Sequence, residues 1–188
     1  MFKRNDDQYV NGNFTWFIGS VEDINDTENL NRVKVRAYGY YDNPEIKTAD
    51  LPWATVMMPV TSASIKGNGG NHHLEIGSWV VGFFRDGPSA QDPMVIGSIA
   101  TQTKGTPDIP EESYVNPGVT QVVDAINAGG NKPSIDNKVY KSKAGHKIEL
   151  DNTSGKEIIK ITHKTGSYIK FLEDGTIEIK SLTKTKVI

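Results

Sequence analysis

HKIELDNTSGKEIIKITHKTGSYIKFLEDGTIEIK, residues 146–180, decides how the C-terminal part of this chain folds. Apolar and polar side chains alternate in four short segments within it: HKIEL (146–150), EIIKITH (157–163), SYIKF (167–171) and TIEIK (176–180). Period-two alternation is typical of β-strands with one buried face. We therefore predict four strands, each with an apolar side and a polar side.

Glycines separate these four segments at nearly constant intervals. Gly145, Gly155, Gly166 and Gly175 are spaced 10, 11 and 9 residues apart. A strand and turn of about ten residues, repeated, predicts a rod-like β-solenoid or prism rather than a globule. One copy of the segment 138–188 has too little apolar side chain to form its own core, so we expect it to need partner chains.

The N-terminal part, residues 1–100, indicates an all-β domain. Alternating or apolar runs without a helix between them predict five strands, at 14–24, 32–38, 54–60, 77–87 and 92–100. Short, strongly twisted strands tend to close on themselves, which removes their exposed edges. We predict a five-stranded barrel of OB type, with an SH3-like barrel as the alternative that the pattern leaves open.

Residues 101–137 have a different character. Pro107, Pro110, Pro117 and Pro133 interrupt the segment, which predicts a linker that packs loosely against the barrel. A short helix is expected at 119–127, ending at two glycines.

The composition excludes several classes of protein. The 188 residues contain no cysteine, so neither disulfides nor thiolate metal sites are available. No run approaches the ~20 apolar residues that cross a bilayer, and the N-terminus has no secretory signal pattern.

The charge is divided unevenly along the chain. Residues 1–137 carry a net charge of −7 and residues 138–188 a net charge of +5. We interpret the positive charge as lysines on solvated strand faces. Binding of this lysine-rich tail to an acidic surface or to membrane headgroups is the alternative.

The candidate metal ligands and catalytic groups are few. His72 and His73 are adjacent on a glycine-rich loop, without a third ligand at a suitable spacing. His146 and His163 are expected at the solvated face or rim of the repeat, although they could form a ladder. We predict no metal site and no cofactor.

We also predict no enzymatic activity. Glu111 and Glu112 are consecutive and cannot flank a sugar bond, so we interpret them as linker charge. The sequence contains no GxSxG, HExxH or phosphate-binding glycine loop.

Aromatic side chains in the barrel segment raise the alternative of an OB-fold protein that binds single-stranded nucleic acid. The set is Trp16, Phe17, Tyr38, Tyr40, Tyr41, Trp79, Phe83 and Phe84. Phosphate binding needs a positive groove, yet this part of the chain is acidic and has one basic cluster, Arg32, Lys34 and Arg36. We therefore assign most of the rings to the core and to protein contacts, and expect no nucleic-acid partner.

Two stretches resemble the central spike protein of contractile-tailed phage baseplates. Residues 32–99, with LPWATVMMP, the glycine-rich loop, GSWVVGFF and PMVIGSI, resemble its OB-fold domain. Residues 141–179 resemble the start of its trimeric β-helix, which is also found in type VI secretion spikes. The two matches together cover 107 of the 188 residues.

The resemblance implies a homotrimeric spike in the virion, made in the host cytoplasm. It would attach to a baseplate hub protein below the tail tube, with a separate tip protein as a further expected partner, and breach the host outer membrane on contraction. The spike of a phage-derived contractile injection system is the alternative within this class. Three copies would bury one apolar row each, which we expect to be Ile148, Leu150, Ile159, Ile161, Ile169, Phe171, Ile177 and Ile179, while the lysines face water.

The chain departs from some members of the family in one respect. These members carry a lysozyme domain between barrel and needle, where this chain has only residues 101–137. The resemblance therefore implies the form of the spike that lacks this domain and its activity on the cell wall. Since the expected barrel begins near residue 14, we also expect the hub to be a separate protein.

Overall fold

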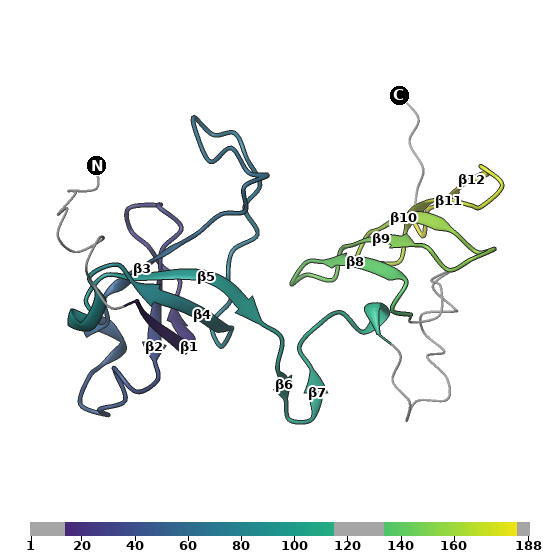
Figure 1. Ribbon diagram of the computed structural model, residues 1–188. Coiled ribbons are helices and arrows are strands. Elements are labelled where there is room, and N and C mark those ends of the chain that lie inside the picture. The colour runs from purple at the N-terminus through teal and green to yellow at the C-terminus, as the bar shows by residue number, and fades with distance from the viewer. Residues whose placement is uncertain (1–13, 115–133, 184–188) are drawn as a thin grey trace. The chain divides into compact units, whose positions relative to one another are not determined.

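The computed structural model describes residues 14–114 and 134–183. It divides into two compact units, Met1–Thr101 and Gln102–Ile188, and each unit has its own β-structure (Figure 1). The helix expected at 119–127 lies outside the described residues.

The first unit is a closed five-stranded barrel. Its strands are β1 (Thr15–Asp23), β2 (Val33–Ala37), β3 (Trp53–Val56), β4 (Trp79–Phe84) and β5 (Pro93–Ile99). They close in the order β1-β2-β3-β5-β4, with β4 paired to β1. Only β3 and β5 are parallel; the other pairs are antiparallel. The five predicted strands are confirmed, and the order is that of an OB barrel, which removes the SH3-like alternative.

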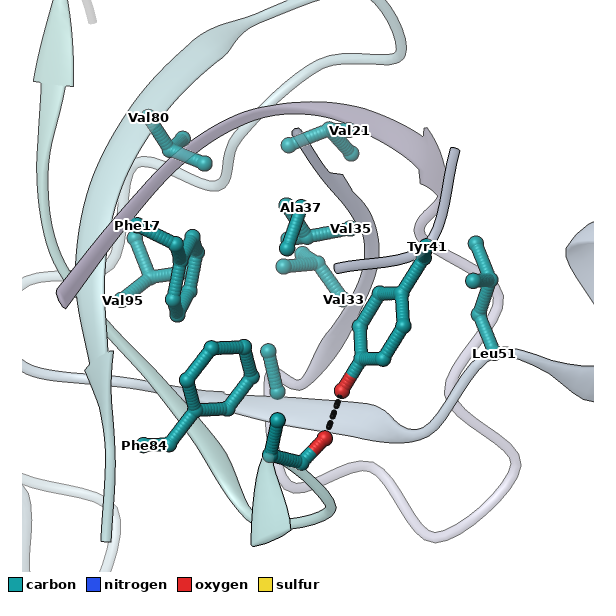
Figure 2. Close-up of a cluster of buried hydrophobic side chains, with 12 residues drawn as sticks. Phe17, Val21, Val33, Val35, Ala37, Tyr41, Leu51, Val80, Phe84 and Val95 are labelled. Atoms are coloured by element: carbon teal, nitrogen blue, oxygen red, sulfur yellow. Dashed lines mark hydrogen bonds between the residues drawn. The ribbon is translucent and has the colours of Figure 1, made fainter. Parts of the chain in front are cut away.

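The barrel interior is filled by alternate side chains of its strands. On β1, Phe17, Gly19 and Val21 are buried while the residues between them are more exposed, as the period of two requires. The core, drawn in Figure 2, consists of Phe17, Val21, Val33, Val35, Ala37, Tyr41, Leu51, Ala54, Val80, Phe84, Ala90 and Val95. Two of its aromatic rings, Phe17 and Phe84, pack with their centroids 4.8 Å apart.

Tyr41 joins the core to a distant turn. Its hydroxyl donates a hydrogen bond to the carbonyl oxygen of Ala90, the residue that ends the short 3-10 helix η2 (Gly87–Ser89) (Figure 2). Burial raises the pKa of Tyr41 to about 12, because the ionised phenolate would lose its hydration.

Closure of the barrel also requires a glycine where strands approach closely. A Cβ atom at Gly82 on β4 would overlap the carbonyl oxygen of Met94 and lie 2.5 Å from Cζ of Phe17. Any larger residue there would displace either the β5 backbone or the central ring of the core.

The second unit is built around a five-stranded antiparallel meander, with strand order β12-β11-β10-β9-β8. The strands are β8 (Asn137–Lys141), β9 (Lys147–Asp151), β10 (Ile158–Thr162), β11 (Tyr168–Phe171) and β12 (Ile177–Lys180). The last four are those predicted between 146 and 180, whereas β8 was not predicted. A small hairpin of β6 (Gln102–Thr103) and β7 (Thr106–Pro107) and the 3-10 helix η3 (Glu111–Ser113) precede the sheet.

The evenly spaced glycines have the conformation that tight turns require. Gly145, Gly155, Gly166 and Gly175 have φ angles of 92°, 72°, 93° and 83°. An L-residue with a Cβ atom is strained in this region, so glycine fixes where each strand ends.

Candidate functional site

One face of the C-terminal sheet carries two rows of apolar side chains. The strand register places Tyr140, Ile148, Ile161, Ile169 and Ile179 opposite one another on β8 to β12. The same register aligns Leu150, Ile159, Phe171 and Ile177 on β9 to β12. These rows contain all eight residues predicted as a trimer core, and they add Tyr140, which was missed. Extending the alternating pattern backwards past Gly145 would have found it.

This apolar face is open in the single chain. The eight predicted residues are between 41% exposed (Phe171) and 68% exposed (Ile179). Cross-strand apolar neighbours of this kind normally lie in a core, and large contiguous apolar patches on a protein surface mark interaction sites. The face therefore has the properties of a surface that another protein surface covers.

The opposite face of the sheet is mostly polar, although Val139, Ile158 and Tyr168 also lie on it, and it includes a charged row. Glu149, Lys160, Lys170 and Glu178 lie opposite one another on successive strands. The expectation that the lysines face water is wrong for Lys160, which is 1% exposed. Its ammonium lies 4.7 Å from the centroid of the Tyr168 ring, because the long side chain lies along the sheet. Burial lowers the pKa of Lys160 to about 8.

Glu112 in η3 is bound to two strands of this sheet. Its Oε1 atom lies 2.9 Å from Nζ of Lys147 on β9 and 3.2 Å from Nζ of Lys141 on β8. Its backbone carbonyl accepts a hydrogen bond of 3.2 Å from Nδ2 of Asn137, a fully buried residue of β8. Burial alone would raise the pKa of Glu112, but hydrogen bonds from Lys147, the backbone and Lys141 outweigh it and leave the pKa below its usual value.

The interpretation of Glu112 as linker charge is therefore wrong, whereas its neighbour Glu111 is exposed. Within the described part of the predicted linker, η3 contacts β8 of the sheet, which differs from the loose packing against the barrel that we expected. No sequence pattern predicts this contact, because it joins residues that are 29 and 35 positions apart.

The three side chains of the basic cluster bind other groups of the barrel. Arg32 pairs with Asp26 at 2.7 Å and Arg36 with Glu22 at 2.9 Å. The Arg32 guanidinium holds the pKa of the Asp26 carboxyl well below its usual range. Lys34 is buried and donates to a backbone carbonyl oxygen. The cluster thus does not form the free positive groove that phosphate binding needs.

The barrel aromatics divide between the core and the surface. Phe17, Tyr41 and Phe84 are buried in the core, so three of the eight rings confirm the part of the prediction that concerns the core. The rings of Trp16, Tyr38, Tyr40 and Trp79 are 40–56% exposed on the outside of the barrel. Trp16, Tyr38 and Tyr40 line one surface hollow with Phe14, which is 72% exposed, and the ring of Trp79 lies 5.4 Å from that of Tyr38.

The histidines occupy two kinds of position. His72 and His73 are exposed on the loop between β3 and β4. His146 is partly exposed and His163 exposed at the ends of β9 and β10, and their ring centroids are 4.5 Å apart. Within residues 14–114 and 134–183, no group of three or more His, Cys, Asp or Glu is placed to hold a metal ion. In the same ranges, no helix is long and apolar enough to cross a membrane.

The closed barrel with this strand order places the chain among the OB-fold proteins. More specifically, it belongs to the Gp5 N-terminal OB domain family, whose family model matches residues 33–164. The pre-baseplate central spike protein Gp5 of Enterobacteria phage T4 is 38% identical over 87 residues, which cover 42% of this chain and 15% of the phage T4 protein. Protein Gp5 of Vibrio phage KVP40 is 35% identical over 107 residues, which cover 53% of this chain and 23% of the phage KVP40 protein. The chain thus matches less than a quarter of the length of either relative.

Proposed function

We propose that this chain is a structural protein of a phage tail, a homotrimeric central spike in the baseplate. The observation that carries the proposal is the open apolar face of the C-terminal sheet, whose two rows are in register over four and five strands. Membership of the Gp5 N-terminal OB domain family supports the place in the baseplate, as does the similarity to the pre-baseplate central spike protein of phage T4.

Three copies of the sheet would close into a triangular needle with the apolar rows facing a common axis. The eight core side chains are each about half exposed in one chain. At about 25 cal/mol per Å² of apolar surface, covering them contributes on the order of 5–10 kcal/mol per chain before the entropy of association is subtracted. The sheet would thus be more stable in the trimer than in a single chain.

The proposed mechanism is mechanical. A closed β-needle has continuous backbone hydrogen bonds and no free edge, so it transmits axial force without fraying. The barrel would attach to a separate hub protein below the tail tube, a tip protein would cap the needle, and the host outer membrane would be breached on contraction. The virion is the expected location, after synthesis in the host cytoplasm.

We further propose that the chain has no activity on the cell wall. Residues 101–137 are too few to form a lysozyme domain, and the Glu111–Glu112 pair is partly used in the contact with β8 and β9. Purified protein is expected to leave a peptidoglycan suspension turbid. Clearing of the suspension at a rate above that of buffer would contradict this part of the proposal.

Cysteine cross-linking tests whether three copies of the apolar row meet at a common axis. The chain has no cysteine, so Ile161→Cys introduces a single reactive site in the middle of an apolar row. With a short bismaleimide, three thiols around one axis link two chains and leave the third unlinked, so the dimer band should level off at about two-thirds of the protein. Ser154→Cys, in the exposed turn between β9 and β10, is the matched control and should remain uncross-linked. Equal cross-linking of both variants would contradict the proposal.

A further inference from the structure

The outside of the barrel is apolar over three neighbouring strands, a surface that we call the β1-β4-β5 face. β4 lies between β1 and β5, and the register aligns the outward side chains of the three strands in rows. The rows are Trp16–Phe83–Met94, Ile18–Val81–Gly97 and Ser20–Trp79–Ile99. None of these nine residues is charged. They alternate along the strands with core residues such as Phe17 and Val80, so they point away from the core.

Neighbouring aromatic rings extend this face beyond the three strands. The ring of Phe14 lies 5.4 Å from that of Phe83, and the ring of Tyr38 lies 5.4 Å from that of Trp79. Tyr40 lines the same surface hollow as Phe14 and Tyr38. The buried core of the barrel contains none of these five rings, so the face is additional to what the barrel needs for its own folding.

The β1-β4-β5 face is as large as one side of a protein–protein interface. Seven side chains on it are 36–72% exposed: Phe14, Trp16, Tyr38, Tyr40, Trp79, Ile96 and Ile99. At roughly 200–250 Å² for one such side chain when fully exposed, they leave about 650–800 Å² accessible. A stable complex buries about 800 Å² on each partner. A continuous apolar surface of this size marks an interaction site, whereas single exposed apolar residues do not.

The charged groups at the two ends of the face are paired within the barrel. Arg36, opposite Ser20, pairs with Glu22 at 2.9 Å, and Arg85 at the end of β4 pairs with Asp92. Stacking of single-stranded nucleic acid on aromatic rings also requires cations that neutralise its phosphates. Because a carboxylate already binds each arginine, the face fits an uncharged, apolar partner surface better than a nucleic acid.

A second copy of the chain does not fit the face in the proposed homotrimer. A patch that binds itself pairs two copies about a two-fold axis. One barrel of the three would then keep its face uncovered. Tryptophan and tyrosine are also among the residues that contribute most to contacts between different proteins.

We propose that the β1-β4-β5 face binds a second protein of the baseplate, which presents an uncharged, apolar surface of similar area. The inference rests on the proposed function for the choice of partner, and deepens it by assigning the barrel surface that attaches. Trp16, Tyr38 and Trp79 form the centre of the contact, and the paired arginines form its polar rim.

Hydroxyl-radical footprinting tests the face, because the three tryptophans of the chain divide between it and the rest of the barrel. Trp16 and Trp79 lie on the face, whereas Trp53 on β3 packs against Arg32 and Lys34 and is the matched control. We expect both face tryptophans to be oxidised at least fivefold more slowly in intact phage tails than in the purified chain, and Trp53 less than twofold more slowly. Unchanged oxidation of Trp16 and Trp79 in tails, or equal slowing of all three, would overturn the proposal.

The same samples separate this inference from the proposed function. Tails that contain the chain with Trp16 and Trp79 still open would overturn the inference and leave the spike role intact. A monomeric full chain whose face is protected in tails would contradict the proposed trimer and support the face. Absence of the chain from tails would overturn both.

A charge placed in the face tests the contact directly. Ile96→Lys changes a residue of the face, and Val60→Lys places the same charge on a fully exposed loop residue as a control. In a phage that lacks the wild-type gene, we expect at least tenfold less Ile96→Lys chain in tails and unchanged incorporation of Val60→Lys. Wild-type thermal unfolding of the purified Ile96→Lys chain would show that the fold is kept, and the footprint decides the question if it is not. Equal incorporation of the two variants would overturn the proposal.

A single-stranded oligonucleotide is the probe for the other class of partner. At micromolar concentration and low salt, it should leave the tryptophan fluorescence of the purified chain unchanged. Quenching that is lost in Trp16→Phe would make nucleic acid the ligand of the face and overturn the proposal.

Discussion

Glu112 is a buried carboxylate with two lysine partners, so a substitution there measures how much the η3 contact stabilises the sheet. Glu112→Gln removes the anion shared by Lys141 and Lys147, and it leaves the largely buried Lys147 with only the more distant carboxylate of Glu149, at 3.7 Å. We expect a loss of about 1–3 kcal/mol in the free energy of unfolding, measured by denaturant titration. Glu111→Gln, one position away and exposed, should change it by less than about 0.5 kcal/mol. Equal effects of the two variants would contradict the assigned contact.

The same carboxylate predicts a pH dependence. The pKa of Glu112 is lower in the folded chain than its usual value of 4.5. A depressed carboxyl pKa stabilises the folded state above the unfolded pKa, and this contribution is lost as pH falls through the folded pKa. The difference in unfolding free energy between wild type and Glu112→Gln should therefore be full near pH 7 and shrink below pH 4.5. A difference that is constant down to pH 2 would show that the charge is not involved.

Tyr41 predicts the opposite behaviour at alkaline pH. Its pKa rises from 10.0 to about 12 on folding, so the folded state keeps the proton longer than the unfolded state does. The contribution is fully present below pH 10 and is lost as pH rises towards 12. Tyr41→Phe removes this dependence and also costs about 1 kcal/mol at neutral pH through the lost hydrogen bond to Ala90. The exposed Tyr40 is the control: in Tyr40→Phe the alkaline loss should persist.

At the scale of the elements, the glycine turns set the strand ends. Gly175 has a φ angle of 83° and a Cβ atom there would meet nothing within 4 Å, so conformation alone decides the effect of a substitution. Gly175→Ala should reduce the free energy of unfolding by about 1–2 kcal/mol, because an L-residue is strained in the left-handed region. Gly175→Asn should cost less, since asparagine tolerates this conformation. The reverse order in thermal unfolding would contradict the assigned turn.

A charged residue placed in an apolar row should change the oligomeric state of the chain, not the formation of its strands. Ile161→Asp places a charge in the middle of a row whose neighbours on both sides are isoleucines, Ile148 and Ile169. Because an unpaired charge cannot be buried against two other copies, we expect the trimer to dissociate while the barrel stays folded. Ser154→Asp in the exposed turn should leave the trimer intact. Sedimentation velocity distinguishes the outcomes, and a trimer of Ile161→Asp would contradict the proposed core.

Local pattern predicted most of the elements but not the contacts between distant residues. The four strands between 146 and 180 could be predicted because alternation and glycine spacing are properties of neighbouring residues. β8 was not predicted, because it is only five residues long and directly follows a proline-rich segment. The Glu112 contact and the His146–His163 pair depend on register between segments far apart in sequence, which the sequence pattern does not contain.

At the scale of the whole molecule, the chain combines a self-sufficient unit with one that is incomplete. The barrel has its own core of twelve buried residues. The C-terminal sheet instead has Ile158 as its one described buried apolar side chain, while the nine aligned residues of its two apolar rows remain open. This contrast is what a spike needs if one part attaches as a folded domain and the other forms only from three chains.

The molar mass in solution tests this account most directly. By multi-angle light scattering, the full chain should have a mass of about 62 kDa, three times the 20.7 kDa of one chain. A shortened chain that ends at Asp136, and so lacks the sheet, should be a folded monomer. A full chain of 20.7 kDa, or a shortened chain that remains trimeric, would contradict the claim that the C-terminal sheet is stable only as three copies.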